Sequence, residues 1–151
     1  ASVDDPQLTD RWPEPIPAHR RFRRVVLDPR GQLPATLKAW QPIQGQPALR
    51  ALCAEAPPLR GVEDLILPPG EGGCSLRHLL HELAAQGVGR VLVEGGATLA
   101  QAFLHQGLVD EWHAFQMETP AGGPVPRLEL PPSWHRVAEA RYPGGTWRVW
   151  R

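Results

Sequence analysis

The stretch Arg90–Glu111, RVLVEGGATLAQAFLHQGLVDE, limits the possible folds more than any other part of the chain. Its first residues, Arg90–Glu94, show almost no polar alternation, which is typical of a strand covered on both faces. A glycine pair follows, and the apolar side chains of Ala97–Gln106 then recur at helical spacing until Gly107, a residue type that commonly ends helices. A strand that passes directly into a helix predicts an α/β fold.

Further elements are predicted on both sides of this stretch. Short apolar or alternating runs bounded by proline and glycine indicate strands at Arg23–Asp28, Ala35–Trp40, Pro47–Pro58, Val62–Leu67, Asp110–Glu118, Ser133–Tyr142 and Thr146–Arg151. A short helix is the alternative for Pro47–Pro58. Ser75 is the predicted N-cap of a helix with leucines at helical spacing from Leu76 to Leu83, and Gly87 ends it. The last two strands turn at Pro143–Gly145.

This order of elements predicts the fold class. We expect a mixed, mostly parallel sheet flanked by helices, with an antiparallel C-terminal hairpin. The 151 residues suit a single domain, 1–151. Within it, residues 1–22 are polar and rich in proline, so they predict an extended segment that leads into the rest of the domain.

Bulk charge and hydropathy argue against some classes of partner. Acidic and basic residues balance at 16 each, which disfavours non-specific nucleic-acid binding and an anionic membrane surface. No stretch approaches the roughly 18 apolar residues of a membrane span. Cys53 and Cys74 form no C-x-x-C pair, so free thiols in a reducing cytoplasm are the preferred interpretation, and a disulfide is the alternative.

The junction between the predicted strand and helix has the composition of a phosphate site. Glycines let a ligand approach the backbone, and the first N–H groups of the helix from Ala97 lack intrahelical partners. Thr98 would add a hydroxyl donor. Glu94 would face a hydroxyl-rich part of the ligand, because a carboxylate repels phosphate. A purely steric turn explains the same glycines, and Glu94 has the alternatives of capping a helix or meeting an arginine.

Three other groups of residues have both a functional and a structural interpretation. The basic cluster His19–Arg24 suggests nucleic acid or a cofactor 2′-phosphate, but a solvated start of a strand is preferred. His78 and His81 are three apart on a predicted helix and lack a third ligand, so no metal site is expected. Four of the six tryptophans lie in the last forty residues, where they suit sheet packing or a subunit interface.

Three motifs together resemble one known family. They are the VLVEGGATLAQAFLHQGLVDE run, the DDPQLTDR segment at Asp4–Arg11 and the RRVVLD strand that ends at Asp28. In order and spacing they are similar to the C-terminal reductase domain of the bacterial riboflavin-biosynthesis deaminase–reductase, a relative of dihydrofolate reductase. The resemblance covers residue 1 to about residue 118, and it implies a dihydrofolate-reductase-like fold.

The resemblance also implies an activity and a set of site residues. It implies a reductase that uses NADPH to reduce the ribosyl group of a phosphoribosylamino-pyrimidine to ribityl. Substrate contacts are implied for Leu8, Arg11 and Glu94. The implied cofactor contacts are Asp4, Gly95, Gly96, Ala97, Thr98, Leu99, Ala100, Gln101 and Ala102. No catalytic acid or base is identified, and Asp110 and Glu111 are interpreted as structural.

The resemblance raises a further expectation about partners. The family domain begins before its D-D-P segment, with strands that contribute to both binding sites, and a deaminase domain with zinc ligands precedes it. We therefore expect the domain in this chain to be incomplete at its N-terminus, with the remainder on another chain or removed. The expected partners are a small-molecule substrate and a second subunit in a homodimer. The alternatives are a non-catalytic half-domain or assembly module, and a related reductase of another substrate.

Overall fold

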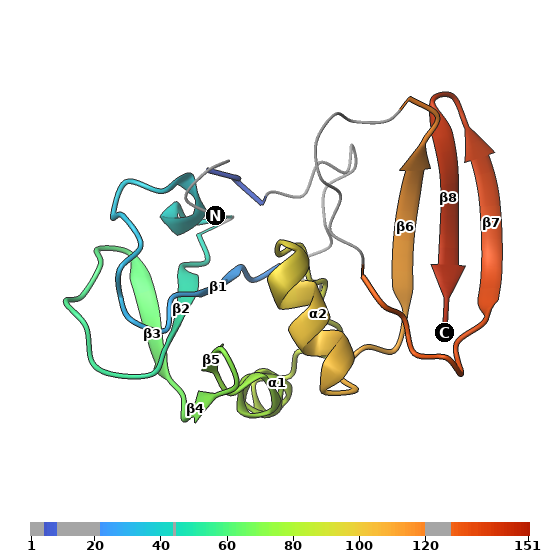
Figure 1. Cartoon of the computed structure of the whole chain (residues 1–151). Helices are drawn as coiled ribbons and strands as arrows, with labels where there is room; N and C mark the ends of the chain where they lie inside the picture. The colour runs from blue at the N-terminus through green and yellow to red at the C-terminus, as the bar shows by residue number, and fades with distance from the viewer. Residues whose placement is uncertain (1–4, 9–21, 44, 120–127) are drawn as a thin grey trace. The chain divides into compact units, whose positions relative to one another are not determined.

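The computed structural model describes residues 5–8, 22–43, 45–119 and 128–151, and the chain divides into two compact units, Ala1–Arg90 and Val91–Arg151. Each unit has a sheet of its own (Figure 1). The first sheet is parallel and the second antiparallel, which confirms the mixed α/β class. The expected single domain and the extended segment at residues 1–22 stay predictions, since most of that segment lies outside the described residues.

A short parallel sheet organises the first unit. Its strands are β1 (Val25–Leu27), β2 (Ala48–Leu52) and β3 (Val62–Ile66), with β2 in the middle (Figure 1). All five residues of β2 are buried, as expected for a parallel strand with both faces covered. The strand interpretation of Pro47–Pro58 is thereby confirmed at its first half, and the predicted strands at Arg23–Asp28 and Val62–Leu67 are confirmed.

One face of this sheet is covered by α1 (Leu76–Ala85), which follows the small hairpin of β4 (Pro69–Gly70) and β5 (Gly73–Cys74). Leu79 and Leu83 of α1 pack in one buried cluster with Leu49 and Ala51 of β2. The other face meets η1 (Lys38–Trp40), where Trp40 and Ala39 cluster with Val26 and Ala48. The sheet is therefore the middle layer of the first unit.

The predicted strand at Ala35–Trp40 is wrong. The segment forms a 3₁₀ turn in which the Trp40 N–H donates to the Leu37 carbonyl at 3.1 Å. The Trp40 indole is 5% exposed, and its Nε1 donates to the Pro34 carbonyl at 2.8 Å. Burying this large side chain while pairing its N–H requires the chain to turn back on itself, so tertiary packing overrides the weak alternation of the sequence.

Both helices begin and end where capping residues predict. The Ser75 hydroxyl accepts from the His78 N–H at the start of α1, and Gly87 with φ +83° ends the helix. In the second unit, α2 (Ala97–His105) ends at Gly107 with φ +62°. There the Gly107 N–H donates to Leu104 and the Leu108 N–H to Phe103, the paired bonds of a Schellman motif.

The second unit contains an antiparallel sheet of β6 (Trp112–Met117), β8 (Gly145–Trp150) and β7 (Arg136–Tyr142), with β8 in the middle (Figure 1). The predicted strands in this part of the chain are confirmed. One face of the sheet is charged, because Arg148 donates to Glu139 and Gln116. The opposite face presents Phe115, Met117 and Tyr142, which are more than half exposed.

The predicted strand at Arg90–Glu94 is wrong for this chain. The segment has no regular structure, and Leu92 is 75% exposed and Val91 42% exposed. A strand exists only where a neighbour supplies hydrogen-bond partners. No described residue pairs with Val91–Val93. The apolar sequence therefore has the pattern of a doubly covered strand without the neighbours that would cover it.

An ion pair between a buried arginine and a more exposed aspartate joins the two parallel strands β2 and β3. Arg50 is 1% exposed, and its Nε and Nη2 donate to the two carboxylate oxygens of Asp64 at 2.8 and 2.7 Å. Its Nη2 also donates to the Pro57 carbonyl at 2.9 Å. The hydrogen bonds from the guanidinium to Asp64 raise the pKa of Arg50. The central strand can contain an arginine because its charge is fully partnered.

We expect Asp64→Ala to lower the free energy of unfolding by about 2–4 kcal/mol, because it removes the carboxylate that pairs with the buried Arg50 charge. The control is Glu63→Ala, which removes the exposed ion pair with Arg23 from the same strand and should cost less than about 1 kcal/mol. Urea unfolding followed by circular dichroism measures both. Equal losses for the two variants would contradict the role given to the pair of Arg50 and Asp64.

Candidate functional site

The N-terminus of α2 presents free backbone donors to solvent. Gly96 is the N-cap, with an extended backbone, and its carbonyl accepts from the N–H groups of Leu99 and Ala100 at 3.0 and 3.1 Å. Among the described residues, the N–H groups of Ala97 and Thr98 have no acceptor. Gly96 and Thr98 are exposed. Two unpaired donors and the positive end of the helix dipole together favour an anion at this position.

Glycine occurs at the two positions of the junction for different structural reasons. A Cβ at Gly95 would collide with the side chain of Leu99, whose Cβ lies 3.0 Å from the added atom. Packing alone therefore requires glycine at Gly95. A Cβ at Gly96 would meet nothing within 4 Å, and its backbone is not left-handed. Because nothing within the chain requires glycine at Gly96, the open space there suits the close approach of a ligand.

Glu94 and the later helix residues differ in their accessibility. Glu94 is exposed, and no described residue hydrogen-bonds to its carboxylate, so neither a helix cap nor an arginine in the described ranges pairs with it. Ala100 is 9% exposed, and the Gln101 Oε1 accepts from the Glu129 N–H at 3.4 Å. A ligand at the helix end therefore reaches Gly96, Ala97 and Thr98 first. The expected cofactor contacts of Leu99–Ala102 stay predictions.

The second predicted group of site residues lies in the N-terminal segment, of which residues 5–8 are described. Asp5 and Leu8 have φ of 39° and 48°, in the left-handed region that non-glycine residues rarely adopt. The Lys38 N–H donates to the Asp5 carboxylate at 2.8 Å, and the Lys38 ammonium lies 3.5 Å from it. Asp4 and Arg11 lie outside the described residues. Strained backbone of this kind persists only where neighbouring groups hold it in place.

Arg24 is the neighbour that the sequence interpretation missed. It is 5% exposed, and its guanidinium donates to the carbonyls of Gln7, Lys38 and Gln41. Burial lowers the pKa of Arg24. The interpretation of this basic cluster as a solvated start of a strand is therefore wrong for Arg24. The sequence signal that could have indicated its burial was its position in RRVVLD, directly before the apolar residues of β1.

The last residue of that motif also has a structural role. Asp28 is 4% exposed, and its carboxylate accepts from the N–H groups of Gln32 and Leu33 at 2.9 and 3.3 Å. It stabilises the turn after β1 in the way that aspartate commonly does. The RRVVLD motif therefore shapes the ends of β1, with Arg24 before the strand and Asp28 after it.

The two halves of the predicted site fall in different units. Leu8 belongs to the first unit, and Glu94 and α2 belong to the second. The roles expected for the α2 N-terminus and for the N-terminal segment, and a site that joins them, stay predictions.

Neither a metal-ligand cluster nor a membrane-spanning helix occurs in the described part of the chain. No group of three or more His, Cys, Asp or Glu side chains there is arranged to hold a metal ion. His78 instead places its Nδ1 2.9 Å from the Ser75 hydroxyl, at the start of α1. None of the described helices combines the length and the apolar content needed to cross a bilayer.

Known proteins are similar to this chain in sequence and in structure. It is 36% identical over 114 residues to the riboflavin biosynthesis protein RibD of Chlamydia muridarum. The aligned region covers 72% of this chain and 30% of that protein. It is 31% identical over 113 residues to a 2,5-diamino-6-ribosylamino-4(3H)-pyrimidinone 5′-phosphate reductase of Methanothermobacter thermautotrophicus, with 72% and 51% coverage. The chain therefore spans from about a third to about half of these relatives.

The solved structure of a deaminase/reductase from Thermotoga maritima superposes with a TM-score of 0.75 over 99% of this chain and 42% of that chain, at 24% identity. This likeness confirms the expected dihydrofolate-reductase-like fold. The family described as the RibD C-terminal domain matches residues 1–129. Since that match takes in the N-terminal segment, the parallel sheet and the α2 junction alike, the chain belongs to the RibD C-terminal domain family.

Proposed function

We propose that this chain is the reductase part of a riboflavin-biosynthesis enzyme, in which it reduces the ribosyl group of a phosphoribosylamino-pyrimidine to ribityl with NADPH, in the cytoplasm. The family and the names of the relatives support a reductase. The observation that supports the proposed NADPH site is made at Gly96. There the exposed N-terminus of α2 has unpaired N–H groups, beside a space that a side chain would fill.

Each proposed contact uses a group that is accessible in the structure or lies in the matched N-terminal segment. The Ala97 and Thr98 N–H groups would hold a phosphate of NADPH, and Asp4 would bind another part of the cofactor. Glu94, which is exposed beside this helix end, would accept from a hydroxyl of the substrate sugar. Arg11 would bind the substrate phosphate and Leu8 the pyrimidine side. NADPH, when bound, supplies the hydride for C1′ of the sugar.

A second candidate function rests on the exposed segment Val91–Val93. Apolar residues with a strand pattern but no strand partner within the described ranges favour a half-domain that becomes complete only with another chain. A titration of the full chain with NADPH separates the two candidates, because a folded chain that binds no NADPH by itself favours the second.

We expect Gly96→Asp to weaken NADPH binding at least about tenfold, because its carboxylate would occupy the proposed phosphate position and repel the phosphate. The control is Gly89→Asp, since a Cβ at Gly89 also meets nothing within 4 Å and its backbone is not left-handed. Isothermal titration calorimetry on the full chain measures both variants. Unchanged affinity in Gly96→Asp would refute the assignment of the cofactor to the α2 N-terminus.

Arg24 is proposed to position the substrate side of the site. It donates to the Gln7 carbonyl from a buried place, next to the strained Leu8 that is proposed to contact substrate. The Lys38 N–H holds Asp5 in the same segment. These two anchors, from the start of β1 and from η1, restrict the backbone on both sides of Pro6.

We expect Arg24→Met to increase hydrogen exchange in the peptide that contains residues 5–8 and to lower the free energy of unfolding by about 2–3 kcal/mol, because three backbone carbonyls lose a charged donor. Arg60→Met, at an exposed arginine in the turn before β3, is the matched control and should change neither. Exchange followed by mass spectrometry gives the first quantity and urea unfolding the second. Normal exchange in this peptide of the folded Arg24→Met variant would contradict the positioning role.

A homodimer is proposed through the apolar face of the second unit, which Phe115, Met117 and Tyr142 form. These side chains are 51%, 59% and 54% exposed, and the rings of Phe115 and Tyr142 lie 6.5 Å apart. Adjacent exposed aromatic residues and methionine on one sheet face are typical of subunit interfaces. The expected role of the C-terminal tryptophans in an interface stays a prediction, since Trp147 and Trp150 are only partly exposed.

We expect Met117→Glu to weaken the dimer at least about tenfold, because a carboxylate would be buried within the apolar interface. Gln116→Glu, the next residue on β6, places the same charge on the opposite face, where Arg148 can accept it as a partner. Sedimentation equilibrium gives the dissociation constants. A monomeric wild-type chain, or equal effects of the two variants, would contradict the proposed interface.

A further inference from the structure

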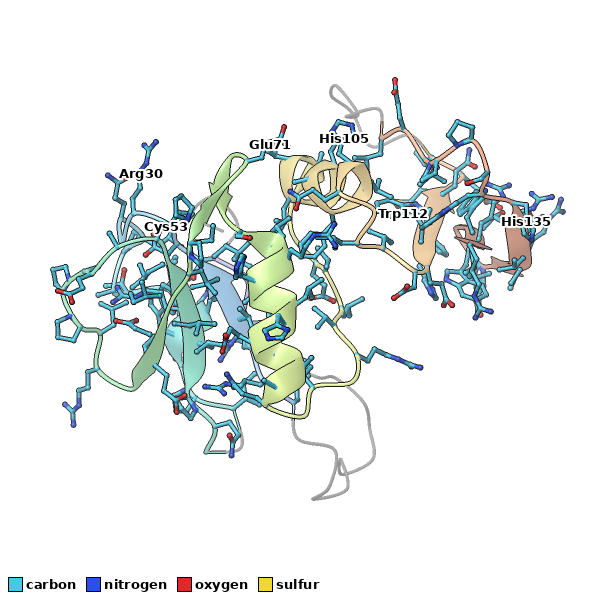
Figure 2. The ribbon with its side chains drawn as sticks, turned by 90° about the horizontal axis from the view of Figure 1, so that it is seen from below. Arg30, Cys53, Glu71, His105, Trp112 and His135 are labelled. Carbon is cyan, nitrogen blue, oxygen red and sulfur yellow. The ribbon has the colours of Figure 1, made fainter. Side chains whose placement is uncertain are left out.

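Two cysteine thiols lie in contact at the carboxyl end of β2, the central strand of the parallel sheet. Cys53 directly follows β2 (Figure 2), and Cys74 is the last residue of β5. Both are free, and their Sγ atoms lie 3.0 Å apart. The Cys53 S–H points to the sulfur of Cys74, whose own Sγ lies 3.6 Å from the Ala51 carbonyl. The chain therefore brings together two thiols that are 21 residues apart in sequence.

Backbone hydrogen bonds hold both cysteines in place. The Cys53 N–H donates to the Pro29 carbonyl at 3.0 Å, in the turn after β1. Cys74 is opposite Pro69 in the β4–β5 hairpin, and the Ser75 N–H donates to the Pro68 carbonyl at 2.9 Å. A disulfide bond of about 2.05 Å would require the two sulfurs to approach by only about 1 Å, a movement within reach of small side-chain rotations.

We propose that Cys53 and Cys74 are a site of reversible oxidation, at which a low-molecular-weight disulfide such as oxidised glutathione converts the two thiols into an intramolecular disulfide. The Cys53 thiolate attacks one sulfur of the reagent, so a mixed disulfide forms and one glutathione thiolate leaves. The Cys74 sulfur, having lost its proton to solvent, then attacks the Cys53 sulfur and expels the second glutathione. Two thiols are oxidised to one disulfide, and one glutathione disulfide is reduced to two thiols.

The surroundings of the two thiols set the order of these steps. Cys53 is partly exposed, whereas Cys74 is 4% exposed within the buried cluster of Leu79 and Leu83. Burial, and then the hydrogen bond with Cys53, raise the pKa of Cys74 to about 12. Cys53 is therefore the thiol that a reagent in solvent reaches first, and Cys74 reacts only with the adjacent mixed disulfide.

Oxidation would stabilise the first unit. The disulfide would close a loop that contains β3 and the β4–β5 hairpin, so the unfolded chain would lose conformational freedom while the folded chain moves little. This inference is independent of the proposed reductase activity, since it concerns the core of the first unit and none of the residues proposed to bind cofactor or substrate.

The test incubates the full chain in glutathione buffers from fully reduced to fully oxidised. We expect both thiols to disappear together, without a glutathione adduct, as measured by mass spectrometry after alkylation. We expect the Tm of the oxidised chain to exceed that of the reduced chain by roughly 5–10 °C. Added dithiothreitol should reverse both changes.

Single-cysteine variants give the control. Cys74→Ala should retain glutathione on Cys53, whereas Cys53→Ala should leave Cys74 largely unmodified, and neither should show the rise in Tm. Both variants change the wild-type volume little, and circular dichroism establishes that they fold. Glutathione adducts without an internal disulfide in the folded wild-type chain, a disulfide between two chains, or thiols that stay free in oxidised buffer would each overturn the proposal.

Discussion

The first unit depends on a parallel strand that is buried on every residue. β2 is hydrogen-bonded on both edges and covered on both faces, so each of its side chains must find a partner inside the protein. Ala48, Leu49, Ala51 and Leu52 do so by apolar packing, and Arg50 does so through Asp64 on the adjacent strand. The ion pair lets a charged residue occupy the centre of the sheet, and it joins β2 to β3 at the same time.

The side chains with specific structural roles lie at the ends of the strands of this sheet. Arg24 lies before β1 and holds both the N-terminal segment and the turn after η1. Cys53 lies after β2, in contact with Cys74 of the small hairpin. Backbone carbonyls and N–H groups at strand ends have lost their ladder partners, so side chains and loops must satisfy them. The hydrogen-bonded ladder between the two ends of the strands fixes the positions of these side chains.

Local rules predicted the helices well and the strands only in part. Ser75, Gly87 and Gly107 mark helix ends through hydrogen bonds made within a few residues, so their effects are legible in sequence. Val91–Val93 has the composition of a buried strand, yet strand formation requires a partner that no local pattern reveals. Arg24 was misjudged for the same reason, because its burial depends on carbonyls far away in sequence.

The sequence by itself determined the helix ends, most of the strand positions and the resemblance that identified the family, since each depends on residue types at short, fixed spacing. It also pointed to the glycine pair as a site. Only the structure distinguished the roles of the two glycines. Gly95 is explained by its contact with Leu99, whereas Gly96 has open space beside it. Likewise, only the fold brought Cys53 to Cys74. Contacts between distant residues depend on how the whole chain packs, which short-range patterns do not encode.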